Sequence, residues 1–404
     1  MNFKRKLWWA QHRTDVYKYG TILSIVLIVT ISIIYFTYSK FTSTNEMTMY
    51  ETTVEPFIKN DYFIASYIDG EWSNEIPGKD DGYVVDKIVC DNGAVGTWDN
   101  DEWGINIRNA TKKIKCSVFF KQATIILGKV IEDESQIATD DADNNIRYIG
   151  ANPNNYVYFN CSDYNNQSDS TCEKWRIIGV FKNMTKEDGS KEDLVKIIRD
   201  DSLGNIAWDS NNVNDWSTAS LKTTLNGDYY NGTYATGAFK NDSTRNTIES
   251  VVWNLGGASD YTTSSSGLAS HWYGYERGTT VYSRRPTTWT GKIALMYPSD
   301  YGYATSGNST TDRATCLAKE LYDWNSASDC YSNDYLYKSS YDQWTLVPNS
   351  YRSTDAFNVY NNGYVYSCYA HDRYGVRPTA FLKSNITISS GNGSSSTPYN
   401  LKLN

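Results

Sequence analysis

The sequence predicts an α+β protein in which β-strands predominate, and three observations support this class. The 404 residues include 34 Tyr, 13 Trp and only 8 Pro, and aromatic side chains favour broad β surfaces. Short apolar runs alternate with turn residues along most of the chain, whereas two segments near its middle carry helix signatures. The net charge of −8 argues against a nucleic-acid partner, which usually requires a basic surface.

An uncharged apolar stretch near the N-terminus predicts a membrane anchor. Residues 22–38 read ILSIVLIVTISIIYFTY, about the length that crosses a bilayer. Basic residues precede it, so we expect a cytoplasmic basic tail at 1–20, a transmembrane signal anchor at 21–39 and extracellular domains beyond. The expected location is the cell membrane, with the lipid bilayer as a partner. A cleaved signal peptide is the alternative, but no small-residue cleavage site follows the stretch.

The next segments predict a stalk followed by a small domain. Residues 40–58 are rich in Thr and Glu and lack periodicity, as in a stalk. In residues 59–122, apolar runs alternate with Gly and Asp turns, which predicts a small β-sandwich-like domain or meander. Residues 123–139 are expected to form a helix or linker.

Residues 140–404 predict a larger α+β domain. A helix is expected within 216–230, where Ser217 can cap and Leu221 shares a face with Leu225, and a second helix at 247–255 before a Gly pair. An Asn-Asn-Gly turn at 361–363 between alternating strands predicts a β-hairpin. Strands are also expected at 156–159, 175–181, 194–199, 292–297, 344–347, 379–383 and 385–388. Two long segments, 258–290 and 301–343, are predicted as loops that carry function.

The cysteines fit an exported, disulfide-bonded protein. All seven lie beyond residue 89, and six of them form plausible local pairs, although spacing alone does not fix connectivity. The candidate pairs are Cys90 with Cys116, Cys161 with Cys172, and Cys316 with Cys330. Cys368 is left over, either as a buried thiol or as an intermolecular link.

Six segments together resemble an uncharacterised domain of anchored surface proteins in low-GC Gram-positive bacteria. They are NIRYIGANPNNYVYFN, WRIIGVF, VKIIRDDSLG, WSTASLKTTLN, ALMYPSDYGYA and GVRPTAFLKSNITISSGNGSSSTPYNL. That domain is similar to the superfamily of the formylglycine-generating enzyme and the C-type lectin-like folds. The resemblance covers about 140–404 and implies a lectin-like α+β fold with long loops, but no established activity.

Clusters of aromatic residues with arginine are the ligand-binding candidates. Tyr supplies large amphipathic contact area at little entropic cost, as in antibody loops, although an AT-rich genome also inflates Tyr and Asn. Both clusters are expected to lie in loops. They comprise His271, Trp272, Tyr273, Tyr275 and Arg277 in the first, and Tyr366, Tyr369, His371, Arg373 and Tyr374 in the second.

Calcium is a weak candidate cofactor, and no other cofactor is expected. Asp141, Asp143 and Asn145 have the alternating oxygen ligands of a calcium loop. Ile146, however, stands where an EF-hand has its turn glycine. Asx turns before a strand are the alternative interpretation.

Three functions remain open from the sequence. The leading hypothesis is a membrane-anchored surface protein whose distal domain binds an unknown glycan or protein, as an adhesin or a ligand sensor. No nucleophile is paired with a base, so we expect binding rather than catalysis. The alternatives are an envelope enzyme related to the formylglycine-generating oxidases, with Cys316 and Cys330 in redox roles, and a structural component of an envelope assembly linked through Cys368.

Overall fold

The computed structural model describes residues 62–403 except 80–82, 100–101, 111–112, 123 and 133–135, together with positions 13, 14, 18 and 22. The predicted basic tail, anchor and stalk therefore lie almost entirely outside the described residues. Among the helices that are described, none is long and apolar enough to cross a membrane. The described residues form two compact units, one of 62–79 with 87–120 and one of 83–86 with 121–403.

The first unit is built from short strands. A four-stranded sheet has the order β2-β1-β6-β3, with β1 parallel to β6, and β4 and β5 form an antiparallel hairpin. The parallel pair departs from the simple meander that the turns predict. A disulfide between Cys90 and Cys116 joins β3 to β6, which confirms that pairing. The strands are β1 Tyr62–Ile68, β2 Glu71–Ser73, β3 Tyr83–Cys90, β4 Val95–Asp99, β5 Gly104–Arg108 and β6 Ile114–Gln122.

The second unit mixes strands with short helices, as the predicted α+β class requires. Its strands are β7 Thr124–Ile125, β8 Ile137–Ala138, β9 Ile146–Tyr148, β10 Tyr156–Phe159, β11 Glu173–Thr185, β12 Lys191–Arg199, β13 Asn205–Ala207, β14 Ile248–Glu249, β15 Val251–Asn254, β16 Thr288–Gly291, β17 Ile293–Ala294, β18 Gln343–Pro348, β19 Asp355–Val359, β20 Val365–Tyr369, β21 Arg373–Gly375, β22 Thr379–Leu382, β23 Thr387–Ser390 and β24 Asn400–Lys402. Its helices are α2 Ile126–Glu132, α3 Ser220–Thr224, η2 Leu225–Tyr229, α4 Asp242–Asn246, α5 Ala269–Glu276, α6 Pro298–Ala304, α7 Arg313–Leu317, η3 Leu321–Ser326 and α8 Ser328–Tyr331.

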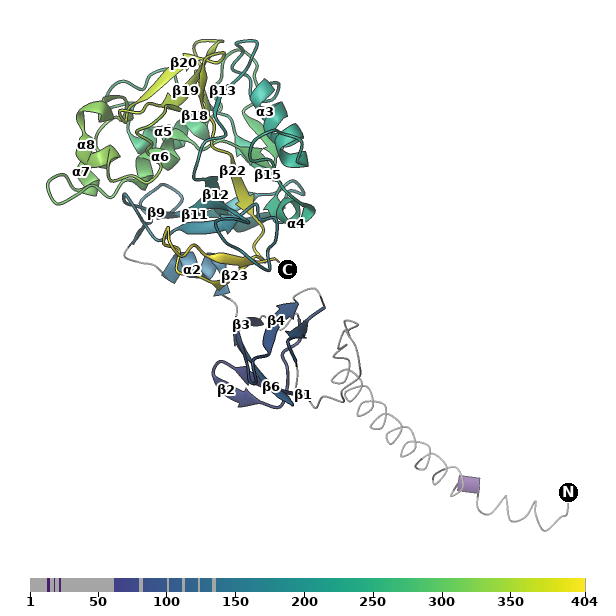
Figure 1. Cartoon of the computed structure of the whole chain (residues 1–404). Helices are drawn as coiled ribbons and strands as arrows, with labels where there is room; N and C mark the ends of the chain where they lie inside the picture. Colours follow the sequence, from purple (N-terminus) through teal and green to yellow (C-terminus); the bar gives the residue numbers. More distant parts are fainter. Residues whose placement is uncertain are drawn as a thin grey trace. The chain divides into compact units, whose positions relative to one another are not determined.

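Two sheets organise this second unit (Figure 1). The larger has the order β14-β22-β12-β11-β9-β8, and the other has the order β13-β21-β18-β19-β20. Consecutive residues of β11 and β12 are buried, because both faces of these central strands are covered. The core includes seven almost completely buried tryptophans, namely Trp175, Trp208, Trp216, Trp253, Trp272, Trp324 and Trp344.

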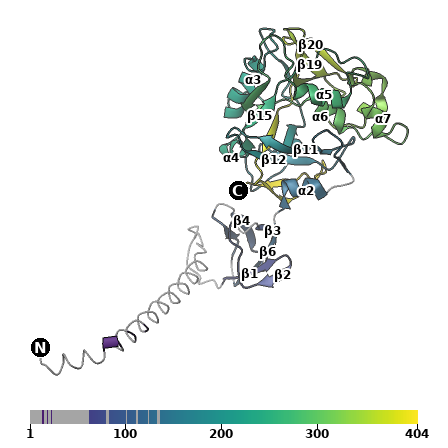
Figure 2. The same cartoon turned by 180° about the vertical axis from the view of Figure 1, so that it is seen from behind.

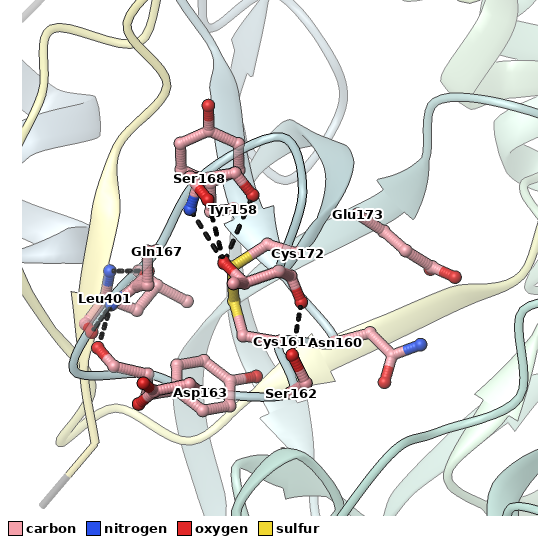
Figure 3. The surroundings of a disulfide bond; sticks show 12 residues. Tyr158, Asn160, Cys161, Ser162, Asp163, Gln167, Ser168, Cys172, Glu173 and Leu401 are labelled. Atoms are coloured by element: carbon pink, nitrogen blue, oxygen red, sulfur yellow. Dashed lines mark hydrogen bonds between the residues drawn. A yellow bond between two sulfur atoms is a disulfide. The ribbon is translucent and has the colours of Figure 1, made fainter.

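The beginning and the end of the second unit meet in one small sheet. Its order is β24-β23-β7, and β23 lies beside α2 in both views (Figures 1 and 2). The loop closed by the Cys161–Cys172 disulfide holds the last strand, since Gln167 Nε2 donates to the Leu401 carbonyl at 2.6 Å and the Leu401 amide donates to Gln167 Oε1 at 2.9 Å (Figure 3). The predicted Cys161–Cys172 and Cys316–Cys330 pairings are both confirmed.

One of the two predicted helices is confirmed and the other is wrong. The first forms α3 and η2, although Ser217 does not cap it, because its hydroxyl donates to Asp215. Residues 247–255 instead contain β14 and β15. Val251 and Trp253 are buried while Val252 and Asn254 are half-buried, which is the period of a strand. The apolar spacing of this segment also fits a helix. The two β-branched valines and the hydrogen bonding of β15 to β16 favour the strand instead.

A close approach between β9 and β11 depends on Gly179. A Cβ atom at this position would lie 2.1 Å from the Ile146 carbonyl oxygen and 2.9 Å from Arg147 Cα. We predict that Gly179→Ala lowers the free energy of unfolding by about 3 kcal/mol, since backbone must move. Gly227→Ala is the matched control, because its Cβ would meet no atom within 4 Å. Equal denaturant midpoints for the two variants would contradict this packing.

A buried carboxyl group predicts how stability depends on pH. Asp334 is 3% exposed, its Oδ2 has no hydrogen-bond partner within the described ranges, and burial raises its pKa well above the usual value. The folded state therefore holds this proton more tightly than the unfolded state, so stability is lost as pH rises above about 4. Asp334→Asn should weaken that loss and should be more stable than wild type at pH 8. Chemical denaturation from pH 4 to 8 checks this, and identical slopes for both proteins would refute it.

Candidate functional site

The hairpin of β19 and β20 presents tyrosines on one face of the five-stranded sheet. Along β20, Val365 and Ser367 are buried whereas Tyr366 is 37% exposed and Cys368 is half-buried. This alternation follows from the strand period of two, which sends successive side chains to opposite faces. In the register, Asn358 pairs with both Trp344 and Tyr366, so these three side chains lie on the same face of the sheet, although Asn358 and Trp344 are buried there.

Five partly exposed rings meet on this face, and we name them the tyrosine face. Tyr360 and Tyr364 stack with centroids 4.5 Å apart, and Tyr364 lies 6.0 Å from Tyr366. Tyr374 of β21 lies 6.2 Å from Tyr360, and Tyr322 of η3 lies 6.0 Å from Tyr366. These ring–ring contacts restrict the movement of each tyrosine side chain and leave part of each ring exposed to solvent.

Three segments that the sequence singled out contribute to this cluster. Tyr261, from the segment 258–290, has its ring centroid 6.3 Å from that of Tyr366 and packs edge-on against Phe357 at 4.8 Å. Tyr322 comes from the segment 301–343, and Tyr366 itself comes from the hairpin. Both segments were predicted as long loops, but they contain helices α5, α6, α7, η3 and α8.

Hydrogen bonds from two other segments fix the turn between β19 and β20. Tyr301 on α6, a fully buried residue, donates its hydroxyl to the Gly363 carbonyl at 2.7 Å. The Asn361 amide donates to Asp342 Oδ1 at 2.7 Å. Gly363 has a φ of +95°, and a Cβ there would lie 2.4 Å from the Tyr331 ring. The turn that orients Tyr360 and Tyr364 is therefore rigid.

A buried amide lies beneath the tyrosine face without a partner. Asn358 has zero exposure, and neither its Oδ1 nor its Nδ2 forms a hydrogen bond with the described residues. Trp344 and Tyr366 flank it in the register. An unsatisfied buried amide costs free energy, on the order of 1–3 kcal/mol, so this position is unusual in a well-packed sheet.

The remaining cysteine belongs to the same face. Tyr360 Oη lies 2.8 Å from Cys368 Sγ. Burial raises the pKa of the Cys368 thiol, and burial also raises the pKa of Tyr374. The thiol is therefore protonated and weakly nucleophilic at neutral pH.

The first predicted cluster does not form a loop surface. Its residues lie on or directly after α5, where Trp272 has zero exposure and Tyr273 is 3% exposed, so neither has a surface for a ligand. Trp272 packs against Phe357 because the helical turn directs it inward. His271 Nδ1 accepts from the Leu268 amide, Tyr275 donates to the Ser266 carbonyl, and Arg277 lies 3.3 Å from the centre of the Tyr273 ring.

The second predicted cluster is divided by the sheet. Tyr366 and Tyr374 lie on the tyrosine face. Tyr369, which is 52% exposed, points to the opposite face by alternation and stacks on His371 with centroids 5.6 Å apart. Arg373 is exposed and donates to the Asn205 carbonyl at 3.2 Å.

The calcium candidates are engaged with other protein groups. Asp141 Oδ2 accepts from Arg147 Nε at 2.6 Å and from Asn145 Nδ2 at 2.9 Å, and Asp143 accepts from the Tyr273 hydroxyl. The loop is an Asx turn held by Arg147, and calcium binding stays a prediction. Within the described ranges, no group of three or more His, Cys, Asp or Glu is arranged to hold a metal ion.

Four residues on or beneath this face lie in segments that the sequence indicates as functional but are not among the individual site residues predicted from it. Tyr322, Tyr360, Tyr364 and Asn358 are absent from the predicted sites. The alternation of Tyr360, Tyr364 and Tyr366 about the Asn-Asn-Gly turn is visible in the sequence and predicts a shared face. Nothing local indicates that Tyr322 joins them.

Comparisons with protein-family models, with curated proteins and with solved structures find no match to this chain. The resemblance drawn from the sequence motifs therefore stays a prediction. Any functional argument rests on the geometry of the tyrosine face.

The state of Cys368 can be checked by thiol titration. We predict one reactive thiol per chain, because the other six cysteines form disulfides. Its reaction in the native protein should be slower than in denaturant by roughly tenfold or more, given its burial and raised pKa. Cys368→Ser should leave no reactive thiol. Absence of any free thiol in wild type would instead indicate an intermolecular link.

Proposed function

We propose that this protein is a surface-anchored recognition module, and that its tyrosine face binds a carbohydrate. The anchor is the apolar stretch at 21–39, and the second unit is the distal, lectin-like domain. The observation that carries the proposal is the contiguous set of five partly exposed tyrosine rings on one rigid sheet face. Three disulfides agree with an extracellular location.

The chemistry of this face favours a sugar. Aromatic rings offer apolar faces to the C–H groups of a pyranose, while tyrosine hydroxyls supply hydrogen bonds at the rim.

Two other functions have less support. A redox enzyme would need a disulfide that a substrate can reach, but Cys316 and Cys330 are at most 1% exposed. An envelope assembly joined through Cys368 would need an accessible thiol, whereas this one is half-buried against Tyr360. We therefore place binding ahead of both.

A glycan array with the full-length chain in detergent tests the proposal. Wild type should bind a restricted set of glycans, and Tyr366→Ala should weaken that binding at least about tenfold through loss of stacking area. Tyr351→Ala is the matched control, because Tyr351 is 79% exposed and outside the tyrosine face. Its affinity should equal that of wild type.

Two results would count against the proposal. One is a folded protein, shown by a cooperative thermal transition, that binds no glycan. The other is an equal loss of affinity in Tyr351→Ala and Tyr366→Ala. If the protein instead binds a protein ligand, and only Tyr366→Ala abolishes that binding, the tyrosine face is the binding surface but its ligand is not a carbohydrate.

A further inference from the structure

A buried amine and a buried carboxyl group meet in the core of the second unit, away from the tyrosine face. Lys196 lies in the middle of β12, and Asp300 lies in the first turn of α6, 104 residues later. Their side chains have zero exposure, and Nζ lies 2.5 Å from Oδ2. The recognition function proposed above does not use this pair.

The surroundings of the amine are aromatic. Lys196 Nζ lies between 4.4 and 5.7 Å from the centroids of four rings, those of Tyr297, Phe181, Trp253 and Phe381. An ammonium group has three donors, yet its one hydrogen-bond acceptor among the described residues is Asp300. Burial lowers the pKa of Lys196 to about 8. The rings and Asp300 stabilise the charged form of this amine, but with a pKa of about 8 its neutral, nucleophilic form is more accessible than that of an ordinary lysine.

Asp300 is a carboxylate, because burial raises its pKa but the charges of Lys196 and Arg147 outweigh burial and hold that pKa below its usual value. Arg147 Nη1 donates to Asp300 Oδ1 at 2.9 Å, and the Tyr297 amide donates to Oδ2 at 2.8 Å. A guanidinium at this position can stabilise the negative charge that Oδ1 gains when a nucleophile adds to Cγ. Glu276 is fully buried and interacts electrostatically with both partners, and burial raises its pKa to about 7. Its oxygens accept from the amide and hydroxyl of Ser299, the residue before Asp300.

We propose that Lys196 and Asp300 condense to form an intramolecular isopeptide bond. Nζ attacks Cγ, the Nζ–Cγ bond forms and the Cγ–Oδ2 bond breaks. Oδ2 leaves as water, and both of its protons come from the ammonium group, so the step needs no oxidant, reductant or co-reactant. The products are a secondary amide, with Oδ1 as its carbonyl oxygen, and one water molecule.

Two consequences of the bond fit the surroundings. Condensation removes one positive and one negative charge together, which leaves Arg147 paired with Asp141 in a neutral cluster. A covalent link between β12 and α6 restrains the unfolded chain in addition to the two disulfides of this unit.

Mass spectrometry of the full-length chain, with its disulfides reduced, tests the proposal. The intact mass should be one water molecule lower than the mass given by the sequence. Proteolytic digestion should yield a branched peptide that joins Lys196 to Asp300, which also excludes dehydration elsewhere. Two separate linear peptides containing these residues, with no branched peptide, would overturn the proposal and leave an ordinary ion pair.

Variants distinguish the bond from an unrelated loss of water. Lys196→Arg keeps the charge but cannot condense, so its mass should equal the mass given by its sequence. Lys338→Arg is the matched control, because Lys338 forms a similar contact with Asp200 at 2.9 Å but is 20% exposed, and it should keep the branched peptide. A water loss that persists in Lys196→Arg contradicts the assignment, and if that variant fails to fold, the wild-type peptide map still decides.

Discussion

The ion cluster of Arg147, Asp300 and Lys196 is the constraint on which the second unit depends. These three side chains are at most 2% exposed and come from β9, α6 and β12, which are far apart in the sequence. Until the proposed isopeptide bond forms, charges buried this deeply are tolerated only when all partners are in place, since loss of one leaves another uncompensated; once it forms, the bond itself joins β12 to α6. The cluster therefore fixes the positions of these three elements together, and the close approach of β9 to β11 at Gly179 belongs to the same arrangement.

The same helix connects this core to the candidate binding surface. Asp300 accepts from the Tyr297 amide and so stabilises the start of α6, and the next residue, Tyr301, donates to the Gly363 carbonyl in the hairpin turn. The Leu346 amide of β18 donates to the Met296 carbonyl just before α6. The tyrosine face thus rests on a helix that buried charges hold in place, which is the rigidity that a recognition surface requires.

Local signals predicted part of this structure. The α+β class, the helix within 216–230, the Asn-Asn-Gly hairpin and the three disulfides depend on residues near one another in sequence, and all are confirmed. Residues 247–255 were misassigned because their spacing also fits a helix, and pairing with β16 decides against it. Trp272 was predicted as a ligand contact although α5 turns it into the core. The contacts of Lys196 with Asp300 and of Tyr322 with Tyr366 are tertiary, and no local pattern reveals them.

We propose the rigid tyrosine face, rather than α5 or the first unit, as the surface that recognises a ligand. Hydrogen exchange of the full-length chain, with and without the glycan that binds best, tests this directly. The account predicts slower exchange confined to β19, β20 and the 361–363 turn, with smaller changes in η3. Slower exchange in residues 269–277 or in the first unit, with the hairpin unchanged, would contradict it.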